Sequence, residues 1–177
     1  MPCHARFKIE ELTMRTIHAA FVALVVLSGS TLAAEPSADS PLRGTWTLVA
    51  ADKILRTGER VSDYGGSPKG RLIVDASGRY SLQIFKSERP RFAAADKAEG
   101  SAEEFKAAVM GSSTHYGTVT VNAGEGTLAF AIESASFPNW EGMRQVREFT
   151  LKEGLLTYRV PQRPDGSTPV SVWRKQE

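Results

Sequence analysis

Residues 70–86 read GRLIVDASGRYSLQIFK, and this stretch decides the fold class. Two runs rich in β-branched and aromatic residues, 70–75 and 79–86, flank a short connection that ends in Gly78. This pattern predicts a β-hairpin, with glycine where the turn needs a positive φ. Apolar side chains of the second run alternate with polar ones and so share one face of the strand: Tyr80, Leu82 and Ile84.

The same pattern recurs on both sides of this hairpin. Further β-rich runs are found at residues 44–51, 115–122, 127–134, 144–152, 155–160 and 169–175, several of them joined by turns at 123–126, 153–154 and 163–166. Eight antiparallel strands joined mostly by hairpins are typical of a closed up-and-down barrel or a sandwich. Closure is favoured because it leaves no exposed edge. We therefore predict an all-β fold, an eight-stranded antiparallel up-and-down barrel with room for side chains or one small ligand.

One segment predicts a short helix. Residues 101–104 read SAEE, a capping box that satisfies backbone N–H groups at a helix start, and Gly111 ends the segment. Its apolar face is formed by Phe105, Val109 and Ala108. The stretches 53–69 and 87–100 are expected to be long loops.

The first 34 residues resemble a signal peptide. The apolar run Ala19–Leu27 is too short to span a bilayer as a helix, follows Arg15, and precedes small residues that fit cleavage after Ala33 or Ala34. A buried N-terminal helix is disfavoured by the polar residues that follow. We expect a signal peptide at 1–34, with Met14 as its true start, a linker at 35–41, a barrel domain at 42–177, and a periplasmic or secreted protein.

The composition excludes several classes of protein. Residues 35–177 hold 19 basic and 18 acidic side chains, so bulk charge does not favour a nucleic-acid partner. Cys3, the single cysteine, lies in the expected leader, so neither a disulfide nor a cysteine-based zinc site is expected. We expect no cofactor, no metal site and no membrane span in the mature chain, and no catalytic motif is present. The oligomeric state stays open.

An ordered set of short motifs adds a resemblance to a known family. The motifs are GTWTL at 44–48, PKGRLI at 68–73, GRYS at 78–81, RPRF at 89–92, FPNWEG at 137–142 and VWR at 172–174. Over about residues 42–175, the chain resembles the bacterial and fungal lipocalin-like domain family. The resemblance implies a calycin-type barrel that binds a small molecule in its mouth; fold transfers better than function within such a family.

The resemblance also implies a role for Trp46, which is expected to close one end of the barrel. Lipocalins commonly set an arginine from the last strand across this indole, a cation–π contact worth about 0.5–2 kcal/mol. Arg174 shares the parity of Val170 and Val172, so we expect it to point inward at this end.

Arg147 is the most informative candidate for a binding residue. It alternates with Phe149 and Leu151, which places a guanidinium on the apolar face of its strand. A buried arginine without a partner is costly. Either a carboxylate such as Glu133 or Glu141 pairs with it, or a carboxylate or carbonyl of a ligand does.

The remaining candidates lie in or near expected loops. Arg89, Arg91, Asn139 and Trp140 could sit at the barrel mouth and contact a ligand, although residues 137–142 could instead form a stiff turn with Trp140 packed as a lid. His115 and Tyr116 lie on one strand. A core or rim histidine is the default for His115, with haem ligation and general-base chemistry as alternatives.

These observations predict an exported lipocalin-like protein that binds a small, largely apolar or amphipathic ligand inside the barrel. Its polar head would be fixed by Arg147, by Asn139, or by the pair Arg89 and Arg91. One alternative is an isomerase or cyclase in which Tyr116, His115 or Arg147 polarises a carbonyl. Another is a structural module that acts through its surface, with a filled barrel and an exposed apolar patch.

Overall fold

The computed structural model describes residues 40–177, so the expected signal peptide, Met14, Cys3 and most of the linker lie outside the described residues. Within this part of the chain the strands are β1 (Gly44–Ile54), β2 (Arg60–Ser62), β3 (Lys69–Val74), β4 (Arg79–Phe85), β5 (Ser112–Asn122), β6 (Thr127–Ala135), β7 (Arg144–Lys152), β8 (Leu155–Arg159) and β9 (Thr168–Lys175). The helix α1 spans Ala102–Met110, and two 3₁₀ turns, η1 and η2, span Lys97–Glu99 and Pro138–Trp140.

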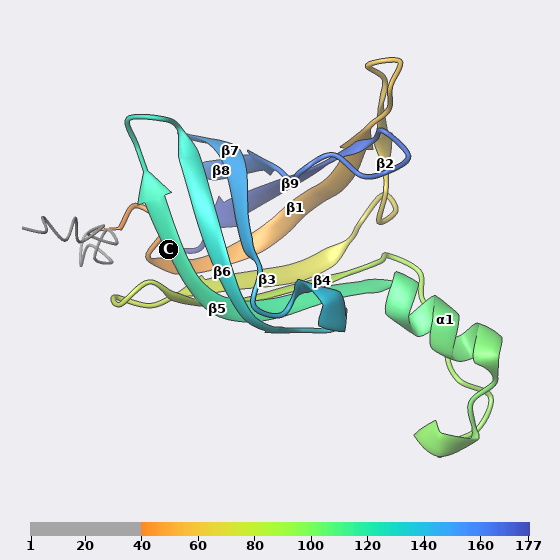
Figure 1. Ribbon diagram of the computed structural model, residues 1–177. Helices are drawn as coiled ribbons and strands as arrows, with labels where there is room; N and C mark the ends of the chain where they lie inside the picture. The colour runs from red at the N-terminus through yellow and green to blue at the C-terminus, as the bar shows by residue number, and fades with distance from the viewer. Residues whose placement is uncertain (1–39) are drawn as a thin grey trace, which may run out of the picture. The chain divides into compact units, whose positions relative to one another are not determined.

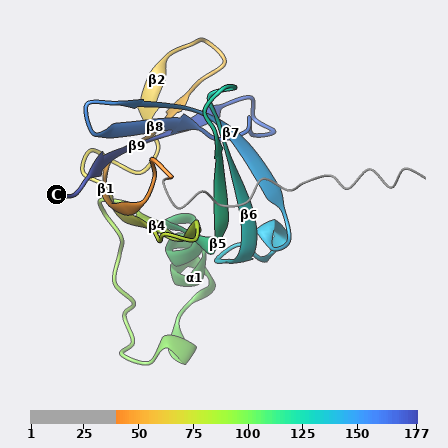
Figure 2. The ribbon, with the colours of Figure 1, turned by 90° about the vertical axis from the view of Figure 1, so that its left-hand side faces the viewer.

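The sheet closes into a barrel. Strands β3 to β9 follow one another in sequence order, each antiparallel to the next, and β1 pairs with both β3 and β9. Eight strands therefore form the ring, and Figure 2 shows them surrounding the interior. This confirms the predicted eight-stranded antiparallel up-and-down barrel.

The segment 53–69 is not the continuous loop that the sequence suggested. Strand β1 continues to Ile54, and its last residues pair with the short strand β2, in a register that places Ile54 opposite Arg60. The pairing of β1 with β3 ends at Thr47, and farther along the same edge of β1 the strand β2 pairs with residues 52–54. The β1–β2 hairpin extends from the barrel in Figure 1.

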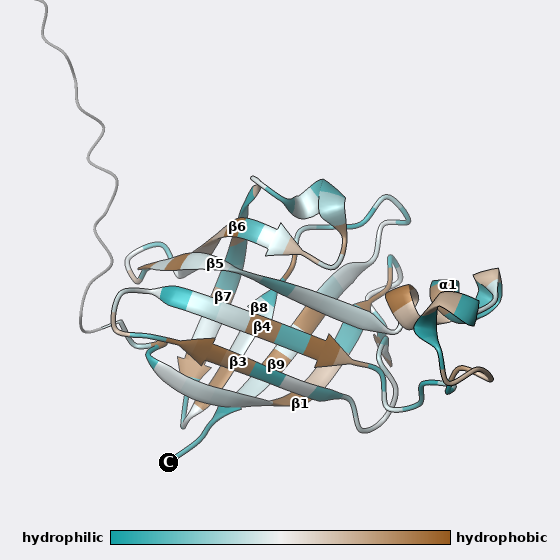
Figure 3. Cartoon of the chain, turned by 90° about the horizontal axis from the view of Figure 1, so that it is seen from below, coloured by the Kyte–Doolittle hydropathy of each residue, from teal (hydrophilic) through white to brown (hydrophobic). Residues whose placement is uncertain are grey.

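One end of the barrel is filled by an apolar core. Trp46, Leu72 and Trp173 have no exposed surface, and Leu42, which precedes β1, is fully buried in the same cluster. The Trp46 indole donates a hydrogen bond from Nε1 to the Leu42 carbonyl oxygen at 2.8 Å. The predicted shared face of Tyr80, Leu82 and Ile84 is confirmed as buried. The same alternation buries Leu128, Phe130 and Ile132 on β6 and Leu156 and Tyr158 on β8, while Val160, next in that alternation, is half-buried. Figure 3 shows the alternation of hydrophobic and hydrophilic residues along the strands.

The expected inward position of Arg174 is wrong. Trp173 is fully buried, whereas Arg174 is exposed. The reason is the register of β9 on β1, in which Trp173 lies opposite Leu48 and Lys175 lies opposite Trp46. Directly opposed residues share a face of the sheet. Lys175 therefore supplies the cation at this end, with its Nζ atom 5.4 Å from the centroid of the Trp46 ring.

The helix α1 forms where the sequence predicts it, with both hydrogen bonds of the capping box between Ser101 and Glu104. Its apolar residues are not buried: Phe105 is 37% exposed and Val109 53% exposed. Phe105 packs on Phe92 of the preceding loop, with the ring centroids 5.4 Å apart. The helix extends away from the barrel in Figure 1, so the barrel does not cover this face.

No helix within residues 40–177 has the length and apolar character needed to cross a membrane.

Candidate functional site

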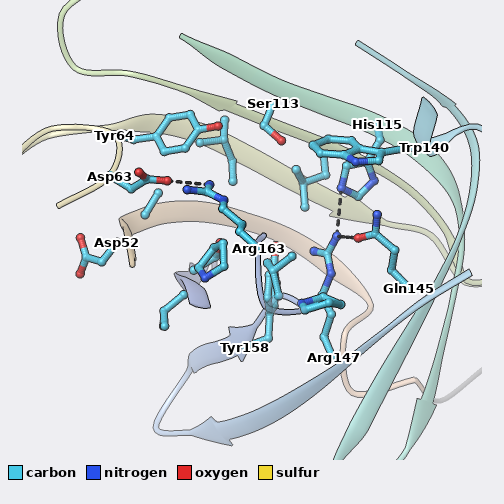
Figure 4. Close-up of a pocket in the computed structure, with 18 of the residues that line it drawn as sticks. Asp52, Asp63, Tyr64, Ser113, His115, Trp140, Gln145, Arg147, Tyr158 and Arg163 are labelled. Carbon is cyan, nitrogen blue, oxygen red and sulfur yellow. Dashed lines mark hydrogen bonds and ion pairs between the residues drawn. The ribbon is translucent and has the colours of Figure 1, made fainter. Parts of the chain in front are cut away.

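A cavity of about 300 Å³ opens at the end of the barrel opposite Trp46. Its rim includes Asp52 near the end of β1 and Ser113 near the start of β5, while Leu82 and Tyr158 lie deeper. The core residues Trp46, Leu72 and Trp173 do not line it. The barrel thus has a filled end and a hollow end, and Figure 4 shows the polar residues of the hollow end.

Arg147 lies at the inner end of this cavity and is 5% exposed. Its position on β7 follows from the predicted alternation, which turns Arg147 inward between exposed neighbours. The guanidinium carbon lies 4.3 Å from the centroid of the Phe130 ring and 4.9 Å from that of Tyr158. Two aromatic rings therefore contact the cation, and such contacts contribute up to about 2 kcal/mol each when desolvated.

Within the described part of the chain, no carboxylate pairs with this charge. Among residues 40–177, the ion pairs within 4.0 Å do not include Arg147. Glu133 points outward because it alternates with the buried Ile132, and Glu141 accepts a hydrogen bond from the Ser134 hydroxyl at 2.7 Å. The internal salt bridge with Glu133 or Glu141, which the sequence left open as one alternative, is therefore not formed among residues 40–177.

The hydrogen bonds of the guanidinium are incomplete within the described part of the chain. Its Nη2 atom donates to Oε1 of Gln145 at 2.9 Å, whereas Nε has no partner there. Tyr158 is 1% exposed, and its hydroxyl likewise lacks a partner among residues 40–177. Burial lowers the pKa of Arg147, an effect that Tyr158 and Tyr80 oppose, and arginine stays charged in proteins. An unmatched positive charge therefore borders the cavity.

His115 is the second polar group on this wall and is 5% exposed. Burial, followed by the nearby charge of Arg147, lowers the pKa of His115 to about 3, so the ring is neutral at pH 7. Nε2 lies 3.4 Å from Nη2 of Arg147, and Nδ1 lies 2.6 Å from the Tyr80 hydroxyl. Because a guanidinium only donates, Nε2 accepts and the Nδ1 proton is donated to the Tyr80 oxygen.

An ionic cluster stands at the cavity mouth. Asp63 accepts from Nη2 of Arg163 at 2.7 Å and lies 3.2 Å from Nζ of Lys53. Burial raises the pKa of Asp63, but the hydrogen bonds and charges of these two cations outweigh it and leave the pKa below its usual value. The cluster ties the loop between β8 and β9 to the β1–β2 hairpin, and Figure 4 shows Arg163 reaching toward Asp63.

Three of the residues singled out in the sequence meet at the cavity: Arg147, His115 and Trp140. The other four lie outside its lining. Tyr116 is 51% exposed because it alternates with the inward His115, and Asn139 is exposed on η2, which turns only Trp140 inward. Arg89 lies over the Phe85 ring at 4.9 Å, and Arg91 is exposed on the same loop. The positions of Asn139, Arg89 and Arg91 therefore do not support the head-group role predicted for them, and the position of Tyr116 does not support contact with a ligand in this cavity.

Sequence reasoning missed several polar groups of the site: Tyr158, Tyr80, Gln145, Asp63 and Arg163. Both tyrosines alternate with polar residues on apolar strand faces, and the hydroxyl of a tyrosine on such a face is a polar group that needs a partner. Asp63 and Arg163 come together from segments 100 residues apart, and neither segment has a periodic pattern that would have brought them together.

Within residues 40–177, no three His, Cys, Asp or Glu side chains are grouped as metal ligands.

The comparison with protein families gives a match over most of the chain. The model of a family described as a lipocalin-like domain matches residues 43–176. A solved structure of a mutant of the fluorescent protein UnaG is similar, with 16% sequence identity and a TM-score of 0.32, over 75% of this chain and 94% of that chain. No curated protein matches the chain.

Proposed function

The chain belongs to the lipocalin-like domain family, and on that premise we propose that it binds one small amphipathic molecule inside the barrel. The observation that carries the proposal is the buried guanidinium of Arg147, which borders a cavity of about 300 Å³ and has no carboxylate partner in the described chain. Cavities of roughly 300–1,000 Å³ are usual for small ligands, so the ligand is compact.

The walls of the cavity suit a molecule with an apolar body and one polar group. Between floor and mouth the wall includes the apolar side chains Ile84, Val160 and Val170 together with the ring of Trp140. Polar groups concentrate at two levels, around Arg147 inside and around Asp63 at the mouth. Burial of the apolar body supplies the free energy, and the polar groups orient the ligand.

Binding is better supported than catalysis. The isomerase or cyclase hypothesis needs an acid or base on the cavity wall, and Tyr116, one of its three candidates, points away. His115 is at the wall, but a ring whose pKa is about 3 is a weak base at neutral pH. A purely surface-acting module predicts a filled barrel, whereas this barrel is hollow at one end.

We also propose that the protein is exported. The apolar run Ala19–Leu27 and the small residues before Ala34 support this, as they fit the length and cleavage pattern of a signal peptide. Expression of the full chain, with the mass of the accumulated protein measured in each cell fraction, tests it. We expect a periplasmic or secreted product that starts near residue 34 or 35; an uncleaved cytoplasmic product would contradict export.

The binding proposal is tested by titration with the neutral fluorescent probe N-phenyl-1-naphthylamine. We expect a single site in the wild type and loss of binding in Ser171→Phe, because Ser171 is buried on the cavity wall and a phenyl ring there fills the space. Ser81→Phe is the matched control: it makes the same change on β4 at a residue outside the cavity lining. Absence of binding in the wild type, or equal binding in Ser171→Phe, would overturn the proposal.

A further inference from the structure

We propose that the ligand is a monocarboxylic acid that enters head first, so that its carboxylate binds at the inner end of the cavity against Arg147 and Tyr158. This inference rests on the proposed function, because it names the chemical class of the molecule that the same cavity binds.

The first argument is the charge at the inner end. Arg147 contributes one positive charge there, and His115 is neutral at pH 7. The acidic residues of the lining are already engaged at the mouth: Asp63 with Arg163 and Lys53, and Asp52 with Arg60 at 2.8 Å. One buried positive charge is balanced by one negative charge. A doubly charged phosphate would leave a buried negative charge, which is costly.

The second argument is the set of donors. The guanidinium offers five N–H groups, and its two hydrogen bonds within the described chain both use Nη2. The Tyr158 hydroxyl adds an O–H without a partner among these residues. Gln145, whose Oε1 already accepts from Arg147, keeps its amide N–H groups available. These groups are donors, so the complementary ligand group is an acceptor with several lone pairs, and a carboxylate provides them together with the charge.

The third argument is orientation. Figure 4 shows Arg147, Gln145 and Tyr158 grouped at one side of the cavity, with Trp140 and His115 beside them and Arg163 farther toward Asp63. The cation at the inner end is the one without a carboxylate partner in residues 40–177, whereas Arg163 at the mouth already has one. An acid therefore gains more by placing its head inside than by leaving it at the mouth. Its apolar body then lies along Trp140, Val160 and Ile84.

The test compares four probes that share one ring: 2-naphthoic acid, methyl 2-naphthoate, 2-naphthalenemethanol and 2-naphthyl phosphate. Each displaces N-phenyl-1-naphthylamine from the wild type at pH 7. We expect the acid to bind at least about 10-fold more tightly than the ester and the alcohol, because of these three only the acid makes charge-assisted hydrogen bonds. We also expect it to bind more tightly than the phosphate.

The outcomes separate this inference from the proposed function. If the neutral dye binds but the acid is no better than the alcohol or ester, or the phosphate is the tightest, the carboxylate assignment fails and ligand binding stands. If the dye does not bind the wild type at all, the proposed function fails with it.

Two variants identify the residues. Arg147→Met removes the charge while keeping an unbranched apolar side chain, and we expect the acid to lose its advantage over the alcohol, a loss of about 10- to 100-fold. A cooperative urea denaturation shows that this variant is folded, and its affinity for the acid and for the alcohol is measured by direct titration. Tyr158→Phe should weaken only the acid, by about 5- to 10-fold. An unchanged preference for the acid in Arg147→Met would overturn the assignment.

His115 provides an independent readout. Because the charge of Arg147 contributes to the low pKa of His115, a carboxylate bound at Arg147 should raise that pKa. NMR titration of the ring nitrogens in the complex with 2-naphthoate should show the rise, and the complex with 2-naphthalenemethanol should show a smaller one. Equal ring titrations in the two complexes would contradict a carboxylate at Arg147.

Discussion

The two ends of the barrel are built by the same strands and differ in what they enclose. At the filled end Trp46, Leu72 and Trp173 are fully buried, and the Trp46 N–H donates to the Leu42 carbonyl. At the hollow end the inward positions carry Arg147 and His115 beside a cavity of about 300 Å³. The filled end contributes stability through its apolar contacts, whereas the hollow end carries polar groups with unused donors that suit ligand binding.

Both ends contain a buried donor without a partner among residues 40–177, and these donors differ in cost. At the filled end it is Nε1 of Trp173, part of a neutral ring. At the hollow end Nε of Arg147, part of a charged group, lacks a partner, as does the neutral Tyr158 hydroxyl. Leaving a charged group incompletely bonded costs more than leaving a neutral one. We therefore expect a substitution of a core residue at the filled end to lower the free energy of unfolding, and an apolar substitution of Arg147 at the hollow end to raise it.

The largest expected effect is at the filled end. Trp46→Ala removes a fully buried side chain and leaves a cavity, so we expect the free energy of unfolding to fall by about 4 kcal/mol. Tyr158→Phe at the hollow end keeps the ring and should change the free energy of unfolding by less than about 1 kcal/mol. Urea denaturation of both variants measures the contrast; similar losses would mean that the two ends contribute alike.

The next effect is the loss of stability in mild acid. His115 titrates near pH 6.5 in the unfolded chain but has a pKa of about 3 in the folded protein, so between these values the unfolded state binds more protons. Stability should therefore decrease as the pH falls through this window, by about 2 kcal/mol between pH 6.5 and pH 5. In His115→Gln this part of the pH dependence should disappear. Parallel curves for wild type and variant would show that His115 is not the group responsible.

A smaller effect of opposite sign is expected for Arg147→Met without ligand. Replacing a buried, unmatched charge by an apolar side chain should raise the free energy of unfolding by about 1–2 kcal/mol, after allowance for the lost contacts with Phe130 and Tyr158. Thermal and urea denaturation of the ligand-free proteins provide the measurement. A destabilised variant would indicate that Arg147 supports the fold, and the contrast between the two ends would lose its basis.

The smallest effect concerns the mouth. Asp63→Asn removes the pairing with Arg163 and Lys53, whose side chains are 37% and 28% exposed, so we expect a loss of about 0.5–1 kcal/mol. The pKa of Asp63 is lowered in the folded protein, so its contribution is present at neutral pH and is lost as the pH falls below the usual aspartate range. Denaturation at pH 7 and pH 3 should show a smaller difference from wild type at pH 3 than at pH 7.

Strand alternation was sufficient to predict the closed barrel and the inward position of Arg147. It failed for Arg174. Val170 and Val172 flank a polar serine, so simple alternation puts Arg174 on their face, whereas the pairing of β9 with β1 turns Trp173 inward instead. The pairing partners of buried polar groups could not be predicted either. Tyr80 and His115 come from different strands, and the distance between their side chains depends on register and rotamers that a single strand does not specify.

A crystal structure of the complex with 2-naphthoate tests most directly where a carboxylate binds in the barrel. We predict the carboxylate oxygens within about 3.2 Å of the Arg147 guanidinium and the Tyr158 hydroxyl, with the naphthalene ring along Trp140. A carboxylate bound to Arg163 at the mouth, with Arg147 still lacking an anion, would contradict the account.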